Sequence, residues 1–404
     1  MVIGEKRLRL AVLQRVCAGY RVGLFAQMAA RPDIEMCLFI GEDVPNSKVK
    51  NAERMDRIPI RKLKTRFIRL GGRILPWHMG LVRELKQFDP DVILCEGESH
   101  FLGYLQALYY RWRFNRPVGL IHWCYISLPG WKTVGGSGMR AAVKALFRRF
   151  FDAFVLYSAY SKECLLKLGQ PSEKAFVATN VCDVEKLVDV SDGLRESRHE
   201  ARRSIGIPER FTVLYLGTLD NVKRPDVMLE LARQCDRVRY NFVLVGGGPL
   251  QEELRDTASR EGLENVFLPG RVTVGLPLYW RAADVLVIPG RGGIVISEAM
   301  AFGLPVIVHQ ADGTEYDLVI NGESGVLLSG GLVSDFRRAI EFLENNPCEC
   351  ARMGVKAQAL VRNHFTTERM ATQIVQAAVF ARNTRDVRGA FRDRRAQPGE
   401  IYRS

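Results

Sequence analysis

The stretch "VLVIPGRGGIVISEAMAFGLPVIV", residues 285–308, decides the fold class. An apolar strand leads through a Gly-rich turn into a short helix that begins near Ile294, and a second apolar strand follows a Gly break. Two strands joined by a helix are the β-α-β unit of a parallel sheet. Because strands and helices alternate in this way along the chain, we predict an α/β protein.

The candidate strands fall into two groups. The first comprises residues 8–14, 34–41, 91–97, 118–124, 153–158 and 175–180, and the second comprises 211–217, 241–247, 266–272, 285–290, 305–310 and 324–330. Residues 189–210 are polar and indicate a linker with one short helix. The chain has 404 residues, which is too long for one ordinary core. We therefore predict two doubly wound, Rossmann-like domains, 1–188 and 211–365, with a ligand cleft at the carboxyl ends of their strands.

The composition is that of a globular protein, with 47% hydrophobic and 25% charged residues. No apolar run approaches the ~18 residues of a membrane span. Arg15 interrupts what would otherwise resemble a signal-peptide core, so we do not expect export. The nine cysteines lack Cys-x-x-Cys spacing, which favours reduced thiols in a cytosolic protein.

The net charge of +13 favours an anionic partner. No nucleic-acid-binding module is recognisable, so we expect no nucleic-acid partner. Residues 54–86 carry ten Lys or Arg against two acids, and bulky apolar residues, including Trp77, lie among them. For the basic segment 57–77 we favour an interfacial role on an anionic bilayer over the alternative, a solvated basic face of a helix. The Arg-rich residues 385–404 predict a disordered tail.

Lys223 follows the strand at 211–217 and precedes a helix that begins near Pro225. A lysine beside a helix N-terminus makes a good anion site, because the unpaired amides and the helix dipole add to its charge. The alternative is an ordinary exposed lysine. The neighbouring "GGGPLQEEL" lacks the full G-x-G-x-x-G spacing, so it indicates a tight turn and not a dehydrogenase fingerprint.

The Gly-rich turn at 290–293 removes side chains where the backbone enters the helix at Ile294. Amides of Gly293, Ile294 and Val295 are therefore candidates for contacts with a phosphate or sugar oxygen. Glu298 lies one turn further into the helix, among small and apolar residues. We interpret it as an acceptor of ribose hydroxyls, with a helix N-terminal charge as the alternative. Glu315, in the next loop, fits a helix cap and a ligand contact equally well.

Two positions in the first half are further candidates. Gly19, in "CAGYR" after the first strand, would let the backbone approach a donor phosphate, although a plain turn also explains it. His122, which we expect to face the cleft, could orient an acceptor or contact a sugar; a lone histidine is more often structural. The Gly-rich loop around Lys132 is either a mobile acceptor loop or a flexible connector.

Six stretches of the second half occur in the order typical of a known family: "GTLDNVK", "VLVGGGPLQEEL", "VFLPGRV", "YWRAADVLVIPG", "SEAMAFGLPVIV" and "DGTEYDLVINGESGVLL". In these motifs the chain resembles GT-B glycosyltransferases of the family 4 type. The resemblance is strong over residues 211–330 and weaker over the first half. It implies two Rossmann-like domains, transfer with retention of configuration, no obligatory metal or cofactor, and a C-terminal helix, 366–384, that crosses back to the first domain.

The resemblance also implies roles for individual residues. Glu298 matches the second acid of the E-x7-E motif, which binds the donor ribose, and Lys223 matches the lysine that meets the donor diphosphate. Gly292 and Gly293 match the turn that presents amides to the donor, and Arg271 lies where the base is usually approached. Two positions depart from the pattern: Gly290 replaces the first acid of E-x7-E, and Thr218 replaces an arginine of the diphosphate site.

Together these features predict a glycosyltransferase in which Lys223, Glu298 and His122 carry the chemistry. The donor is a nucleoside-diphosphate-sugar, and the acceptor is a glycan or a polyprenyl-linked saccharide. We expect a cytoplasmic protein, peripheral on the inner face of the membrane. The alternatives are a sugar-nucleotide epimerase of the same fold, or a degenerate nucleotide-binding or scaffold member, which the departures at Gly290 and Thr218 motivate.

Overall fold

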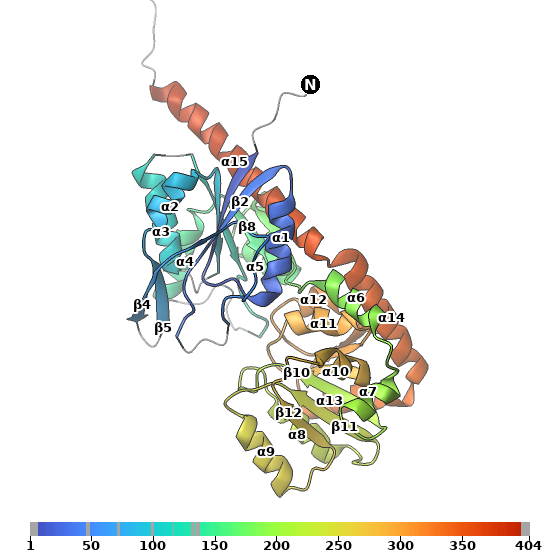
Figure 1. Cartoon of the computed structure of the whole chain (residues 1–404). Coiled ribbons are helices and arrows are strands. Elements are labelled where there is room, and N and C mark those ends of the chain that lie inside the picture. Colours follow the sequence, from blue (N-terminus) through green and yellow to red (C-terminus); the bar gives the residue numbers. More distant parts are fainter. Residues whose placement is uncertain are drawn as a thin grey trace, which may run out of the picture.

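The computed structural model describes residues 7–45, 49–70, 73–97, 101–115, 117–130, 134 and 138–396. These residues form two α/β halves, each built on a parallel sheet, and a long C-terminal helix that runs along both (Figure 1). The predicted α/β class with two Rossmann-like units is confirmed.

The N-terminal sheet has seven parallel strands in the order β3-β2-β1-β6-β7-β8-β9. The strands are β1 (Leu8–Gln14), β2 (Ile34–Ile40), β3 (Ile60–Lys62), β6 (Val92–Glu96), β7 (Gly119–Cys124), β8 (Ala153–Leu156) and β9 (Ala175–Val177). The helices of this half are α1 (Val22–Ala30), α2 (Leu81–Phe88), α3 (Phe101–Arg113), α4 (Gly138–Arg148), α5 (Ala159–Lys167) and α6 (Val184–Gly193). Most strand residues are buried on both faces, as expected for a parallel sheet covered by helices.

The C-terminal sheet has six parallel strands in the order β12-β11-β10-β13-β14-β15. The strands are β10 (Phe211–Leu216), β11 (Tyr240–Val245), β12 (Val266–Gly270), β13 (Val285–Ile288), β14 (Val306–Val308) and β15 (Gly325–Leu327). The helices are α7 (Arg198–Ser204), α8 (Asp226–Gln234), α9 (Gln251–Arg260), α10 (Leu276–Ala282), α11 (Ile294–Ala301), α12 (Glu315–Leu318), α13 (Val333–Asn345) and α14 (Pro347–His364). All twelve strands predicted from the sequence are present in these two sheets.

The strand orders locate the ligand-binding edges. In an open α/β sheet the crevice lies where the strand order reverses, outside the carboxyl ends of the strands. That point lies between β1 and β6 in the N-terminal sheet and between β10 and β13 in the C-terminal sheet. The two carboxyl edges meet, because the Ala159 N–H after β8 donates to Asp317 Oδ1, in α12 after β14, at 3.1 Å.

The basic segment 57–77 forms strands, which excludes the helical alternative. β3 is the edge of the N-terminal sheet, and β4 (Thr65–Leu70) pairs antiparallel with β5 (Arg73–His78) as a separate hairpin. The hairpin is visible at the lower left of the N-terminal half in Figure 1. Among the described residues, no helix combines the length and the apolar character needed to cross a bilayer.

The C-terminal helix α15 (Thr367–Ala396) packs against the N-terminal sheet and extends beyond residue 384. The disordered tail predicted from residue 385 is therefore wrong for the residues up to Ala396; those from 397 lie outside the described residues. Gly119 at the start of β7 lets α15 approach closely, since a Cβ there would lie 3.0 Å from the Ala381 carbonyl oxygen. The buried Asp152 carboxylate also pairs with Arg385 Nη2 of α15 at 2.7 Å.

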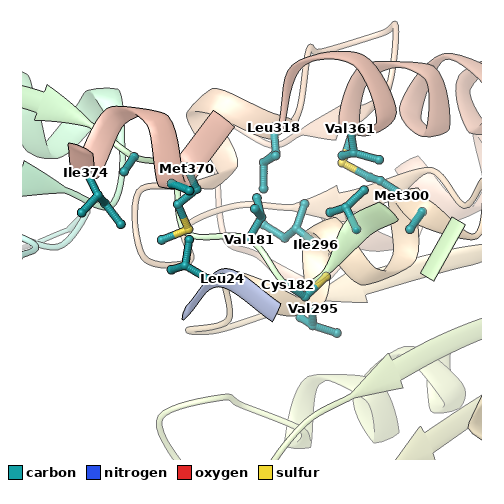
Figure 2. Close-up of a cluster of buried hydrophobic side chains, with 14 of the residues drawn as sticks. Leu24, Val181, Cys182, Val295, Ile296, Met300, Leu318, Val361, Met370 and Ile374 are labelled. Carbon is teal, nitrogen blue, oxygen red and sulfur yellow. The ribbon is translucent and has the colours of Figure 1, made fainter. Parts of the chain in front are cut away.

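One hydrophobic core continues across both halves. Figure 2 shows part of it, where side chains from α1, the 181–182 segment, α11, α12, α14 and α15 meet. Cys182 ties this junction to α11, because its N–H donates to Ser297 Oγ at 3.3 Å. All nine cysteines are free thiols, and Cys348 alone among them is exposed. The shared core fixes the floor of the space between the two carboxyl edges.

Candidate functional site

Lys223 is held by a tight turn at the carboxyl end of β10. Its N–H donates to Asp220 Oδ1 at 3.1 Å, and the following residue, Arg224, has a left-handed φ of 53°. The side chain folds back toward the sheet edge: Cβ atoms placed on Gly217 and Gly292 would lie 3.3 and 3.7 Å from Nζ. The ammonium group therefore lies between the ends of β10 and β13, at the point where the strand order reverses.

The Lys223 turn rests directly on Gly290. The Arg291 N–H donates to the Val222 carbonyl at 3.1 Å. A Cβ on Gly290 would lie 2.7 Å from that same carbonyl oxygen and 2.8 Å from the Lys223 carbonyl carbon. Real Cβ atoms do not come so close to backbone, so this turn conformation requires glycine at 290. The turn that presents Lys223 therefore occupies the space that a side chain at position 290 would need.

Glu298 lies in the second turn of α11, on the side that faces Lys223. Burial raises the pKa of its carboxyl group, and the nearby Lys223 ammonium opposes that shift. A small cavity lies beside Lys223 at the ends of β10 and β13. Its lining consists of Tyr215, Leu216, Lys223, Val287, Ile288, Arg291, Gly292 and Val295. An ammonium, a carboxylate and the start of a helix thus share one sheet edge, which suits a ligand that carries both phosphates and hydroxyls.

The start of α11 is packed against the loop that follows β14. Gly293 caps α11, and a side chain there would overlap the Asp312 carboxylate. Glu315 shapes this loop: its carboxylate accepts from the N–H groups of Ala311 at 3.0 Å, Asp312 at 3.2 Å and Gly313 at 2.7 Å. Glu315 is fully buried and holds the loop that precedes α12, whereas the N-cap of α12 is Thr314 and makes no side-chain cap hydrogen bond.

The turns after β11 and β12 continue the same edge. Gly246 and Gly248 lie against the carbonyls of Gly217 and Leu219, where Cβ atoms would overlap them. The "GGG" stretch is therefore a close-packed turn, as its spacing indicates. The Thr218 carbonyl accepts from the Tyr215 hydroxyl at 2.7 Å. Arg271 is exposed beside Gly247, directly after β12.

Gly19 and His122 come from the N-terminal half. Gly19 opens a short 3-10 turn, Gly19–Arg21, at the carboxyl end of β1; it is exposed, and a side chain there would meet no atom within 4 Å. His122 lies within β7 on the face that packs against α3, which contradicts the expectation that it ends a strand facing the cleft. Its ring stacks on Phe151 at 4.8 Å and meets Tyr104 edge-on at 5.0 Å.

The environment of His122 is that of a core residue. Burial lowers its pKa to about 3, and Nε2 has no hydrogen-bond partner among the described residues. The expected role of His122 in the chemistry therefore has no support in the geometry, since a strand residue points to one face only and this face is the helix layer. The loop around Lys132 lies outside the described residues.

The structure thus brings together Lys223, Glu298 and the turn at 292–295, with Thr218 and Arg271 further along the same edge. Tyr215 and Arg291 also line the cavity; Tyr215 lies in an apolar strand whose pattern gives no sign of a site. Among the described residues, no group of three or more His, Cys, Asp or Glu side chains is arranged to hold a metal ion. Two Rossmann-like units with a phosphate-type site at one of the meeting carboxyl edges define the GT-B class.

Comparisons with known proteins identify the family within that class. The family model "Glycosyltransferase Family 4" matches residues 18–186, and the model "Glycosyl transferases group 1" matches residues 197–360. The chain belongs to the glycosyltransferases that combine these two domains.

Curated relatives match in part. A D-inositol 3-phosphate glycosyltransferase 2 from Catenulispora acidiphila is 30% identical over 225 residues, which is 52% of each chain. A D-inositol 3-phosphate glycosyltransferase from Thermomonospora curvata is 29% identical over 224 residues, 51% of this chain and 52% of that protein. The chain thus matches about half the length of these relatives.

Solved structures match nearly the whole chain. HepE from Anabaena, crystallised with UDP, aligns with a TM-score of 0.69 at 20% identity and covers 92% of this chain and 99% of that one. Sucrose-phosphate synthase from Thermosynechococcus elongatus aligns with a TM-score of 0.69 at 18% identity and covers 95% and 100%. At these identities the likeness concerns the fold.

Proposed function

We propose that the protein transfers a sugar from a nucleoside-diphosphate-sugar to a glycan or lipid-linked saccharide acceptor, with retention of anomeric configuration. The observation that carries the proposal is the position of Lys223 Nζ between Gly217 and Gly292, near the half-buried Glu298 of α11. A diphosphate beside Lys223 would extend its nucleoside toward Glu298 and Arg271. The matching HepE structure holds UDP, which makes a uridine nucleotide the first donor to test.

In the proposed reaction the bond between the sugar C1 and the diphosphate oxygen breaks, and the acceptor oxygen bonds to C1 on the same face of the ring. The acceptor proton passes to the departing phosphate oxygen. Lys223 and the amides at the start of α11 stabilise the negative charge that develops on the diphosphate, which is the largest electrostatic requirement of the step. Glu298 accepts hydrogen bonds from the ribose hydroxyls and fixes the nucleoside.

Hydrolysis of a donor panel tests this proposal. UDP-, GDP- and ADP-sugars are incubated with the wild type, Lys223→Ala and Glu298→Gln, and the released nucleoside diphosphate is quantified. We expect turnover of one nucleotide class, reduced about 100-fold or more in Lys223→Ala, because single donors to a developing anion contribute on the order of 10²–10³ in rate. NMR of an early sugar product reports the anomer. Nucleotide binding without turnover of any donor would favour the non-catalytic alternative.

We further propose that the protein acts at the cytoplasmic face of an anionic membrane, which it contacts through the β4–β5 hairpin. Arg66 pairs with Trp77 and Ile68 with Leu75, so these side chains share one face of the hairpin. Ile68 and Trp77 are 40% and 38% exposed beside the exposed Arg66. Exposed apolar side chains next to basic ones suit the boundary between lipid headgroups and acyl chains.

Flotation with phosphatidylglycerol vesicles and with neutral phosphatidylcholine vesicles tests the membrane contact. We expect the wild type to float with the anionic vesicles and the double variant Arg66→Glu/Trp77→Ala to remain in the dense fraction. Val238→Ala, which removes a more exposed apolar side chain (71%) on the C-terminal half, is the control. Equal flotation of the wild type and the double variant would refute this part of the proposal.

A further inference from the structure

Glu96 is a carboxylate at the point where the strand order of the N-terminal sheet reverses. It is the last residue of β6, which lies between β1 and β7. Its side chain remains partly exposed at the carboxyl edge that faces the C-terminal half. The donor-type site described above occupies the corresponding point of the other sheet, so Glu96 lies on the opposite wall of the space between the two halves.

The contacts of Glu96 leave acceptor capacity unused. The Arg15 N–H donates to Oε2 at 3.0 Å, and the Gln14 amide, oriented by its neighbours, donates to Oε2 at 3.1 Å and to Oε1 at 3.3 Å. Among the described residues, no ion pair engages this carboxylate. Because an ionised carboxylate offers about four acceptor positions, these contacts leave room for a further donor. Burial raises the pKa of Glu96, and the charges of Arg15 and Arg21 oppose the shift.

Glu96 lies beside a group formed by one arginine and two aromatic rings. Glu96 and Trp123 are paired in register on the neighbouring strands β6 and β7, so their side chains lie on the same face of the sheet. The Arg21 guanidinium lies over the rings of Trp123 at 4.6 Å and Tyr20 at 5.2 Å, and it donates to Asn180 Oδ1 at 2.7 Å. These contacts link Glu96, Trp123, Arg21 and Tyr20 in one cluster. Tyr20 is 40% exposed at the rim of this cluster. The Trp123 indole N–H is buried and has no hydrogen-bond partner among the described residues.

The chemistry of the cluster selects its ligand. An anionic group would be repelled by Glu96, and a cation would be repelled by Arg21. A purely apolar ligand would leave the carboxylate desolvated and unpaired, which is unfavourable. A sugar or polyol ring suits both the carboxylate and the aromatic ring, because its hydroxyls donate to the carboxylate while its C–H face covers the exposed aromatic ring.

We infer that Glu96 and Tyr20 form the subsite for the acceptor ring: Glu96 accepts from an acceptor hydroxyl, and the Tyr20 ring covers one face of the ring. This inference rests on the proposed transferase function and adds the residues that position its acceptor. Glu96 binds the acceptor, and it takes no proton in the reaction.

Glu96→Gln and Tyr20→Ala test the subsite, with Tyr109→Ala, a 49% exposed tyrosine on α3, as the matched control. Gln retains an oxygen that can accept from Arg15, so Glu96→Gln should unfold at the temperature of the wild type. Three quantities are measured: affinity for UDP and for UDP-glucose, hydrolysis of UDP-glucose, and saturation-transfer NMR binding of free glucose, galactose, N-acetylglucosamine and inositol in the presence of UDP.

We expect both variants to keep wild-type affinity for UDP and UDP-glucose and wild-type hydrolysis. We expect them to bind the free sugars or inositol about 10- to 100-fold more weakly, the range of a hydrogen bond to a charged group. This weaker binding should raise the KM for the acceptor and leave donor hydrolysis unchanged. Unchanged probe binding in both variants, or binding of no probe to the wild type, would overturn the subsite.

Two outcomes separate this inference from its premise. If Glu96→Gln weakens UDP-glucose and leaves UDP unaffected, the hydroxyls belong to the donor sugar, and the acceptor assignment is overturned. If the wild type binds no nucleotide at all, the transferase proposal itself fails, and the acceptor subsite fails with it.

Discussion

Replacement of Gly290 tests whether the Lys223 turn excludes a side chain at this position. In Gly290→Ala the new Cβ would lie 2.7 Å from the Val222 carbonyl oxygen and 2.9 Å from that of Lys223. Both neighbours are backbone, so the contact is relieved only if the turn moves away from α11. Overpacking of this kind costs about 1–3 kcal/mol, which corresponds to a fall of about 2–4 °C in melting temperature per kcal/mol for a domain of this size. Gly290→Glu, which places a larger side chain at this position, should be at least as damaging.

The same movement should displace the Lys223 ammonium from the end of β10. Loss of one charge-assisted contact to a diphosphate weakens binding by about 10- to 100-fold. Differential scanning fluorimetry gives the melting temperature, and titration calorimetry gives the affinity for UDP. Gly193→Ala is the control, since a Cβ there meets no atom within 4 Å. A Gly290→Glu variant with wild-type stability and with equal or tighter UDP binding would refute the steric account of Gly290.

Two other substitutions test the placement of buried polar groups. In His122→Phe we expect donor turnover to persist and the loss of stability at low pH to become smaller. A folded-state pKa of about 3 means that only the unfolded state binds a proton at this histidine just below about pH 6.5. His122 therefore lowers the free energy of unfolding progressively as the pH falls, by about 2 kcal/mol at pH 5. Urea unfolding at pH 7.5 and pH 5 measures this difference, and loss of turnover would restore His122 to the site. In Asp152→Ala, removal of a carboxylate that pairs with Arg111 at 3.3 Å and Arg385 at 2.7 Å leaves buried charges uncompensated and should lower the free energy of unfolding by about 3–5 kcal/mol. An unchanged urea midpoint would contradict the role given to this link between α15 and the sheet.

The fold could be predicted because buried parallel strands appear in the sequence as short apolar runs. Each run between Leu8 and Leu327 that the sequence marks as a strand forms one. The β4–β5 hairpin was missed, because basic residues among bulky apolar ones suggest a membrane surface before they suggest a strand. The alternation of Arg66, Phe67, Ile68 and Arg69 before a Gly-Gly pair is the local signal that predicts a hairpin.

The site was predictable where its residues belong to one sheet edge. Lys223 and Glu298 follow neighbouring strands of the C-terminal sheet, so the topology alone brings them together. His122 was misplaced, because a strand pattern does not tell which face a central residue takes when both faces are buried. Glu96 was missed for the opposite reason: an acid that ends an apolar strand is a weak local signal, and its significance appears only when the strand order places it where the sheet reverses.

Titration of UDP into the wild type, Lys223→Ala and Glu298→Gln tests the central claim most directly, namely that the β10–β13 edge holds the diphosphate and ribose of a donor nucleotide. We predict saturable binding to the wild type, with affinity about 10- to 100-fold weaker in each variant and with the Lys223→Ala defect smaller for uridine than for UDP. The claim would be contradicted if the wild type bound none of UDP, GDP and ADP, or if both variants bound UDP as tightly as the wild type.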